Sequence, residues 1–226
     1  MQKIILAALL CFSGTAFAAD GMLQKDCASC HNIIGPAAQT LKDALAKKGP
    51  DLFYAGNKYR QEWLASWLQK PARIRPAGMY YGDHIKAGAK GDEIDASTLT
   101  DHVALSQADA TAIAAELVKL KPHDALIAKE KIEPGTITKQ TGEMNFDKFQ
   151  GCMACHLIEP EYGGVSGPEL YTAAKRLRPE FMASYIRNPQ AWDPKTWMPN
   201  KQLSDGGIHK LVHYLEVLSK ESANAQ

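Results

Sequence analysis

The chain has 226 residues and a formal charge of +1, with 26 lysine and arginine side chains against 25 aspartate and glutamate side chains. Without a basic excess, the composition argues against nucleic acid as a partner, because phosphates are bound mainly by clustered lysine and arginine. No internal apolar run approaches the roughly 18–20 residues that a membrane-spanning helix needs. We therefore expect neither a nucleic-acid partner nor a transmembrane segment.

The first 18 residues have the pattern of a cleaved export signal. Lys3 supplies a positive start, residues 4–12 form an apolar run, and residues 16–18 (Ala-Phe-Ala) form a small-x-small cleavage site. We expect cleavage after Ala18 and export to the periplasm, with an uncleaved anchor as the alternative. Removal of Lys3 leaves 25 basic and 25 acidic side chains, so the mature chain has no formal net charge.

Two C-x-x-C-H motifs dominate the predicted mature chain. They consist of Cys27, Cys30 and His31, and of Cys152, Cys155 and His156. Two thiols at this spacing can bond the two vinyl groups of one haem, and the adjacent histidine is placed to bind the iron. A redox C-x-x-C motif or half a zinc site is the alternative for a single match. Because the motif occurs twice, we expect two covalently attached haem c groups with iron.

The two motifs lie at the start of two similar stretches of sequence. At an offset of 118 residues, residues 49–52 (Gly-Pro-Asp-Leu) match residues 167–170 (Gly-Pro-Glu-Leu), and residues 63–68 match residues 181–186. Such self-similarity indicates a duplicated unit. The predicted organisation is a signal peptide at 1–18, one domain at 19–120, a linker at 121–140 and a second domain at 141–226. A strap packed on one domain is the alternative to the linker.

The apolar spacing along the chain predicts helices. They cover residues 41–45, 63–68, 106–117, 181–186 and 204–218. Ser106 and Ser204 are expected to cap the helices that follow them. No segment shows sustained alternation of apolar and polar residues, which is the usual sign of a strand. The predicted fold class is therefore all-α.

Each haem iron needs a second axial ligand unless an open position serves chemistry. The candidates are Met79, His84 and His102 in the first half, and Met182, Met198, His209 and His213 in the second half. Met182 aligns with Leu64 on a helix face, so packing explains it. Met79 and Met198 each follow a helix-ending proline by eight or nine residues, and the repeat therefore favours them. A thioether ligand raises the reduction potential and favours electron transfer.

The order of C-x-x-C-H, Gly-Pro-x-Leu, helix, loop methionine and C-terminal helix resembles that of class I cytochromes c. As a tandem, the chain is similar to the dihaem cytochromes c, the group that includes cytochrome c4. The resemblance implies two tandem class I domains, each wrapped around one haem. It also implies that the carbonyls of Pro50 and Pro168 accept the proximal histidine N–H groups, and that Tyr214 packs against the helix bearing Phe146 and Phe149.

The first half departs from the family pattern after its loop methionine. Met79 lacks the proline that follows Met198, and about 21 extra residues precede the next helix cap. This insertion runs from Tyr80 to Leu105 and contains His84, the main rival to Met79 as a ligand. We expect the insertion to modulate partner contact, with a plain surface excursion as the alternative.

These features predict a periplasmic electron carrier rather than an enzyme. Its two His/Met-ligated haems would pass single electrons between redox partner proteins, and it would have no transmembrane segment. One alternative is an electron-transfer subunit held tightly in a periplasmic or membrane-associated oxidoreductase complex, with peripheral contact to a membrane complex. Another is a dihaem enzyme with one open axial position, for which the mature chain offers no spare thiol. The donor, the acceptor and the oligomeric state stay open.

Overall fold

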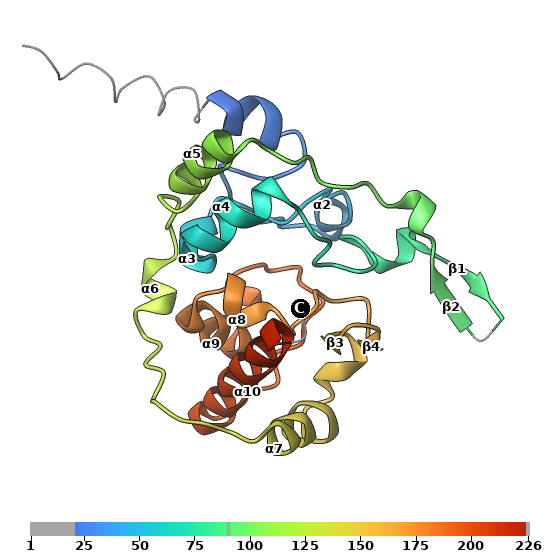
Figure 1. Ribbon diagram of the computed structural model, residues 1–226, viewed down its shortest axis with the longest axis vertical. Coiled ribbons are helices and arrows are strands. Elements are labelled where there is room, and N and C mark those ends of the chain that lie inside the picture. Colours follow the sequence, from blue (N-terminus) through green and yellow to red (C-terminus); the bar gives the residue numbers. More distant parts are fainter. Residues whose placement is uncertain (1–20, 90, 225–226) are drawn as a thin grey trace, which may run out of the picture.

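The computed structural model describes residues 21–89 and 91–224, so the predicted export signal lies outside the described residues (Figure 1). The first half contains α2 (Leu41–Leu45), α3 (Ala55–Lys58), α4 (Gln61–Gln69), β1 (Ile85–Gly88), β2 (Gly91–Ile94) and α5 (Gln107–Leu117). The second half contains α7 (Lys139–Met144), β3 (Leu157–Glu159), β4 (Tyr162–Gly163), α8 (Ala173–Arg176), α9 (Pro179–Arg187) and α10 (Asp205–Asn224), and α6 (Asp124–Ile127) lies between the halves. No helix in these ranges is both long and apolar enough to cross a membrane.

The prediction of an all-α fold in two tandem class I cytochrome c domains is wrong, because the structure contains two antiparallel two-stranded sheets. In the first sheet, β1 pairs with β2 and Ile85 faces Ile94. In the second sheet, β3 pairs with β4 through a turn in which Glu161 has a φ of 63°. These strands are two to four residues long, too short to show the alternation that marks longer strands. The described fold is therefore mixed, with helices predominating.

The repeat seen in the sequence recurs in the positions of the helices. The bounds of α3 and α8, and those of α4 and α9, differ by the same 118 residues. Both predicted N-caps are confirmed, because the Ser106 hydroxyl accepts the Asp109 N–H at 3.2 Å and the Ser204 hydroxyl accepts the Gly207 N–H at 3.3 Å. The last helix packs as expected on Phe146, whose ring centre lies 5.6 Å from that of Tyr214. Phe149 is exposed instead.

The two halves meet through backbone as well as side chains. Tyr59 and Leu177 form an isolated antiparallel bridge. Flanking hydrogen bonds run from Arg60 N to Arg176 O and from Arg178 N to Lys58 O, each at 3.0 Å. The donors Arg60 and Arg178 are 118 positions apart, and so are the acceptors Lys58 and Arg176. The two bonds are therefore equivalent under the repeat. The two halves are therefore related by a local two-fold axis at this bridge.

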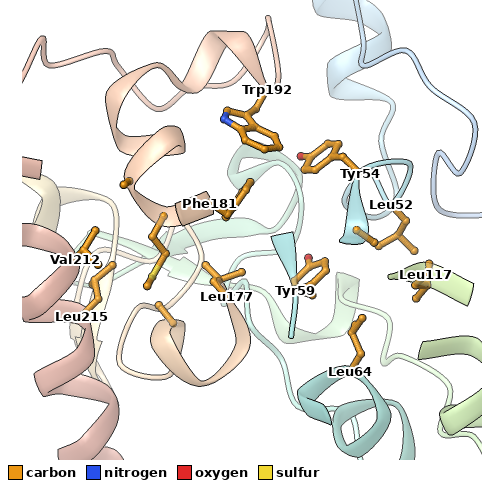
Figure 2. Close-up of a cluster of buried hydrophobic side chains, with 14 of the residues drawn as sticks. Leu52, Tyr54, Tyr59, Leu64, Leu117, Leu177, Phe181, Trp192, Val212 and Leu215 are labelled. Carbon is orange, nitrogen blue, oxygen red and sulfur yellow. The ribbon is translucent and has the colours of Figure 1, made fainter. Parts of the chain in front are cut away.

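The buried side chains of both halves form one hydrophobic cluster (Figure 2). At the junction, Tyr54 of the first half contacts Trp192 and Phe181 of the second, with ring centres 5.4 and 6.4 Å apart. Trp192 is only 1 % exposed, and its indole N–H donates to the Ser184 hydroxyl at 3.1 Å. Burial of large aromatic rings from both halves stabilises their relative placement.

Residues 121–140, predicted as a linker, pack against both halves. The buried Asn57 of the first half donates a hydrogen bond to Asp124 Oδ1 at 2.7 Å. On the second half, Arg187 donates two hydrogen bonds to the Glu130 carboxylate, at 2.8 and 3.0 Å. Asp124 and Glu130 therefore connect this segment to both halves.

Candidate haem-binding sites

Each C-x-x-C-H motif folds into a single tight turn. The backbone N–H of His31 donates to the carbonyl of Cys27 at 2.9 Å, and that of His156 donates to Cys152 at 3.2 Å. A π-helical turn leads into each motif, over Leu23–Cys27 and Asn145–Phe149. All four motif cysteines are free thiols. Each turn therefore holds two thiols and one imidazole on one short stretch of backbone.

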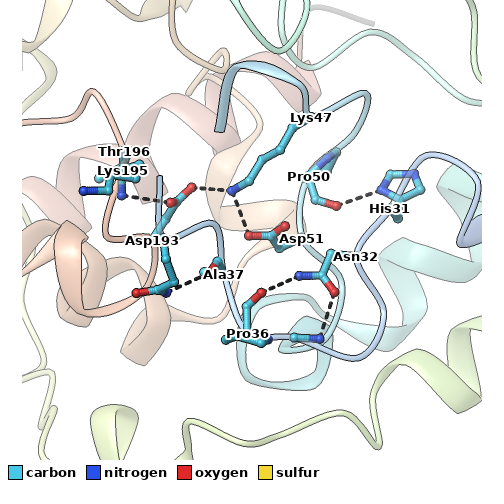
Figure 3. Close-up of polar contacts among 12 residues, drawn as sticks. His31, Asn32, Pro36, Ala37, Lys47, Pro50, Asp51, Asp193, Lys195 and Thr196 are labelled. Carbon is cyan, nitrogen blue, oxygen red and sulfur yellow. Dashed lines mark hydrogen bonds and ion pairs between the residues drawn. The ribbon is translucent and has the colours of Figure 1, made fainter. Parts of the chain in front are cut away.

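Both motif histidines are oriented by a proline carbonyl. His31 Nδ1 lies 2.8 Å from the carbonyl oxygen of Pro50 (Figure 3), and His156 Nδ1 lies 2.7 Å from that of Pro168. When Nδ1 donates this hydrogen bond, Nε2 is the nitrogen left to bind a metal. The structure thus contains, in both halves, the hydrogen bond that the family resemblance implied.

The surroundings keep both imidazoles neutral, the form that binds iron. Burial lowers the pKa of His156 to about 4, and the hydrogen bond to Pro168 opposes this shift only in part. Burial is also the largest cause of the lowered pKa of His31. At neutral pH, neither ring needs to lose a proton before it can act as a ligand.

The thiols differ from those of a redox C-x-x-C motif. Redox motifs lower the pKa of the first cysteine, so that a thiolate is present at neutral pH. Here burial raises the pKa of the Cys152 thiol to about 11, and it raises the pKa of Cys27 as well. These surroundings disfavour the thiolate, which argues against the redox alternative at both motifs.

A glycine lies directly against each motif histidine. A Cβ added at Gly49 would lie 2.5 Å from His31 Cε1, and one at Gly167 would lie 2.6 Å from His156 Cε1. Carbon atoms do not approach so closely, so neither position admits a larger residue unless the ring moves. An oriented imidazole beside two thiols at C-x-x-C spacing is the arrangement that covalent haem attachment requires, because the thiols can bond the vinyl groups and the imidazole can bind the iron. The residues present therefore fit the predicted cofactor.

Gly167→Ala is expected to lower the free energy of unfolding by about 1–3 kcal/mol, the usual cost of adding a methyl group to a packed site. The new methyl group would push the His156 ring away from the Pro168 carbonyl. The matched control is Gly206→Ala in the first turn of α10, where an added Cβ meets nothing within 4 Å. Denaturant unfolding of both variants checks this, and equal stabilities would contradict the tight placement of His156.

The two loop methionines lie in adjoining loops. Met79 and Met198 are both half-buried. Gln190 fixes the second loop by donating to the carbonyl oxygen of Met198 at 2.9 Å. Tyr80, next to Met79, stacks on Trp197, next to Met198, with ring centres 6.0 Å apart and an interplanar angle of 25°. The repeat therefore brings its two candidate ligand loops together across the junction.

Buried carboxylates at equivalent repeat positions were missed in the sequence. Asp51 and Glu169 are 4 % and 3 % exposed and directly follow the two prolines. Lys47 lies between Asp51 and Asp193, at 2.9 and 2.8 Å, and so joins the two halves (Figure 3). Glu169 faces Arg176, which is also buried. The sequence signal that could have identified these two carboxylates is the match between the Gly-Pro-acidic-Leu segments that contain them.

The histidine ring found closest to His31 belongs to His102. Their ring centres are 6.1 Å apart, and the rings are inclined by 50°. His84, the expected rival to Met79, lies instead against the backbone of Gly78. Sequence spacing gave no reason to prefer His102, because it lies near the end of the long insertion.

Comparisons with protein-family models, with curated proteins and with solved structures found no match for this chain. The resemblance to dihaem cytochromes c therefore stays a prediction. Within the described ranges, no three histidine, cysteine, aspartate or glutamate side chains gather as a site for a bare metal ion. A porphyrin-held iron takes only one or two ligands from the protein, so this observation leaves the haem prediction open.

Proposed function

We propose that the chain is an exported c-type electron carrier with two haems. One haem would be attached at residues 27–31 and the other at residues 152–156. The observation that carries the proposal is the twofold occurrence of one arrangement: a C-x-x-C-H turn whose histidine donates from Nδ1 to a proline carbonyl at 2.7–2.8 Å. Both copies of the duplicated unit therefore keep the motif together with the contact that orients its histidine.

The protein residues would bind, orient and shield these groups. A bound haem supplies a one-electron Fe(III)/Fe(II) couple. The carbonyl of Pro168 holds the ring of His156 and raises its basicity as a ligand. Met198 would be the second residue that holds that iron, and its thioether would raise the reduction potential. With two protein ligands on the iron, small molecules would have no free site to bind, which favours electron transfer over catalysis.

The proposal is tested by producing the chain in a bacterial host that attaches c-type haem and exports the product. We expect the purified protein to begin after residue 18 and to exceed the polypeptide mass by two haem groups. We expect low-spin spectra in both oxidation states and no carbon monoxide binding to the reduced protein. A product with no attached haem, or a reduced form that binds carbon monoxide at both irons, would refute the proposal.

A further inference from the structure

The spacing of His31 and His102 suits two ligands of one iron. Their ring centres lie 6.1 Å apart. With a metal–nitrogen bond of about 2 Å on each side and about 1 Å from nitrogen to ring centre, two imidazoles on opposite sides of one metal have centres about 6 Å apart. From this spacing and the contacts below, and resting on the proposed function, we infer that His102 is the second axial ligand of the first haem.

His102 has the same orienting contact as the motif histidines. Its Nδ1 lies 2.8 Å from the carbonyl oxygen of Val103, as His31 Nδ1 lies 2.8 Å from that of Pro50. A donating Nδ1 leaves Nε2 for the metal and fixes the orientation of the ring. Nδ1 of each imidazole thus has a carbonyl partner, although His102 is exposed and its partner is the adjacent residue, whereas the partner of the part-buried His31 is 19 positions away.

The segment that carries His102 is anchored on both sides. Before it, Arg73 pairs with Asp101 at 2.7 Å. After it, the Leu105 N–H donates to the carbonyl of Leu68 at the end of α4 at 2.8 Å. The His102 ring also packs on Trp67 of α4, with centres 4.8 Å apart. The β1–β2 hairpin projects from the molecule (Figure 1), but the end of the insertion returns to the helix beside the haem motif.

The His84 side chain and the loop that carries Met79 have other contacts. His84 Nδ1 bonds to the Thr98 hydroxyl at 2.8 Å, within the insertion. A Cβ added at Gly78 would lie only 2.6 Å from His84 Nε2. This nitrogen therefore lies against the backbone of Gly78. Met79 shares its loop with Tyr80, whose ring stacks on the second half. Of the two rival histidines, His102 has a ring contact with His31 among the described residues, and His84 has none.

An unequal pair of haems follows from this assignment. The second half has only six positions from Met198 to Ser204, so it lacks an equivalent of the segment that carries His102. The first iron would have two imidazole ligands and the second an imidazole and a thioether. Because the thioether favours reduced iron more strongly, the first haem would have the lower potential. Electrons entering at the first haem would then move to the second.

The weak red absorption band of methionine–iron coordination tests the assignment in the oxidised wild-type protein. We expect one equivalent of this band for two haems, and electron paramagnetic resonance signals from one bis-histidine and one His/Met low-spin haem. Two equivalents of the band, with no bis-histidine signal, would overturn the assignment. These readouts need no variant, so they do not depend on whether a variant folds.

Variants identify which histidine is responsible. His102→Ala is expected to convert one of the two haems to a high-spin form that binds carbon monoxide, whereas His84→Ala and Met79→Ala leave both haems low-spin. If His84→Ala or Met79→Ala produces the high-spin haem instead, the assignment is wrong. Mass spectrometry of every variant must still show two attached haems. Absence of haem from the wild-type protein would refute the proposed function, whereas two haems with a different ligand would refute only this assignment.

Discussion

Replacing both Cys152 and Cys155 with alanine is expected to leave one haem per chain, a loss of half the bound cofactor. In the proposed protein, two thioether bonds would form the covalent link at this site, and the turn that holds the cysteines also places His156 beside Pro168. Without the link, retention of the second haem would depend on the axial ligands alone. Mass spectrometry and haem quantification of the exported protein measure the result.

The matched control is the double change of Cys27 and Cys30 to alanine, which should remove the other haem and leave that of the second half. The spectra of the two variants should therefore add up to that of the wild-type protein. Retention of two covalently bound haems in either variant would contradict the attachment sites. If haem is lost when Cys152 and Cys155 are replaced but not when Cys27 and Cys30 are replaced, the motif at Cys27 is not a haem site.

Glu169→Ala is expected to destabilise the protein by about 3–5 kcal/mol, the usual cost of leaving a buried charge without its partner. Glu169 Oε1 lies 3.6 Å from Arg176 Nε, and both side chains are 4 % exposed. Glu169 also accepts hydrogen bonds from the backbone and hydroxyl of Thr172. Burial already lowers the pKa of Arg176, and the Glu169 charge opposes that shift. Its removal leaves the guanidinium charge in an apolar interior.

Glu159→Ala is the control for this variant. Glu159 lies in the same half and pairs with Lys139 at 2.6 Å, but its side chain is 47 % exposed. Such surface pairs contribute about 1 kcal/mol or less, so this variant should unfold close to the wild-type midpoint. Chemical denaturation followed by circular dichroism compares the two variants. A loss at Glu169 no larger than that at Glu159 would contradict a stabilising role for the buried pair.

The helical repeat was predictable because local sequence determines it. Four apolar side chains recur on one face of both α4 and α9, and Pro71 and Pro189 follow soon after these helices end. The capping serines form hydrogen bonds within three residues, so spacing alone identifies them. The duplicated segments then restricted the loop-methionine candidates to Met79 and Met198.

The hairpins were not predictable in the same way. Strand β1 exposes Lys86 and Ala87 and only half-buries the residues at its ends, so no apolar stripe marks it. Its pairing with β2 places Gly88 opposite Gly91 at the turn, and this glycine spacing was the one local signal. In the second sheet, the turn residue with a positive φ is Glu161, whereas glycine is the usual residue in that conformation. The turn therefore has no glycine that would indicate it in the sequence.

The ligand environment of the first motif depends on contacts between distant residues. His31 and His102 are 71 positions apart in the sequence, and the intervening insertion has no counterpart in the second half. Pattern matching favoured Met79 because it corresponds to Met198 in the repeat. The observed packing of His102 on Trp67 is a tertiary contact, and no periodicity in the insertion indicates it.

An anaerobic potentiometric titration of the mature full-length protein, followed by its haem absorption, tests the central claim most directly. Two haems that carry single electrons predict two one-electron transitions, reversible in both directions, with two electrons taken up per chain. Each transition should convert one low-spin haem between its oxidised and reduced spectra. Uptake of one electron or none per chain, or a spectrum without haem, would contradict the account.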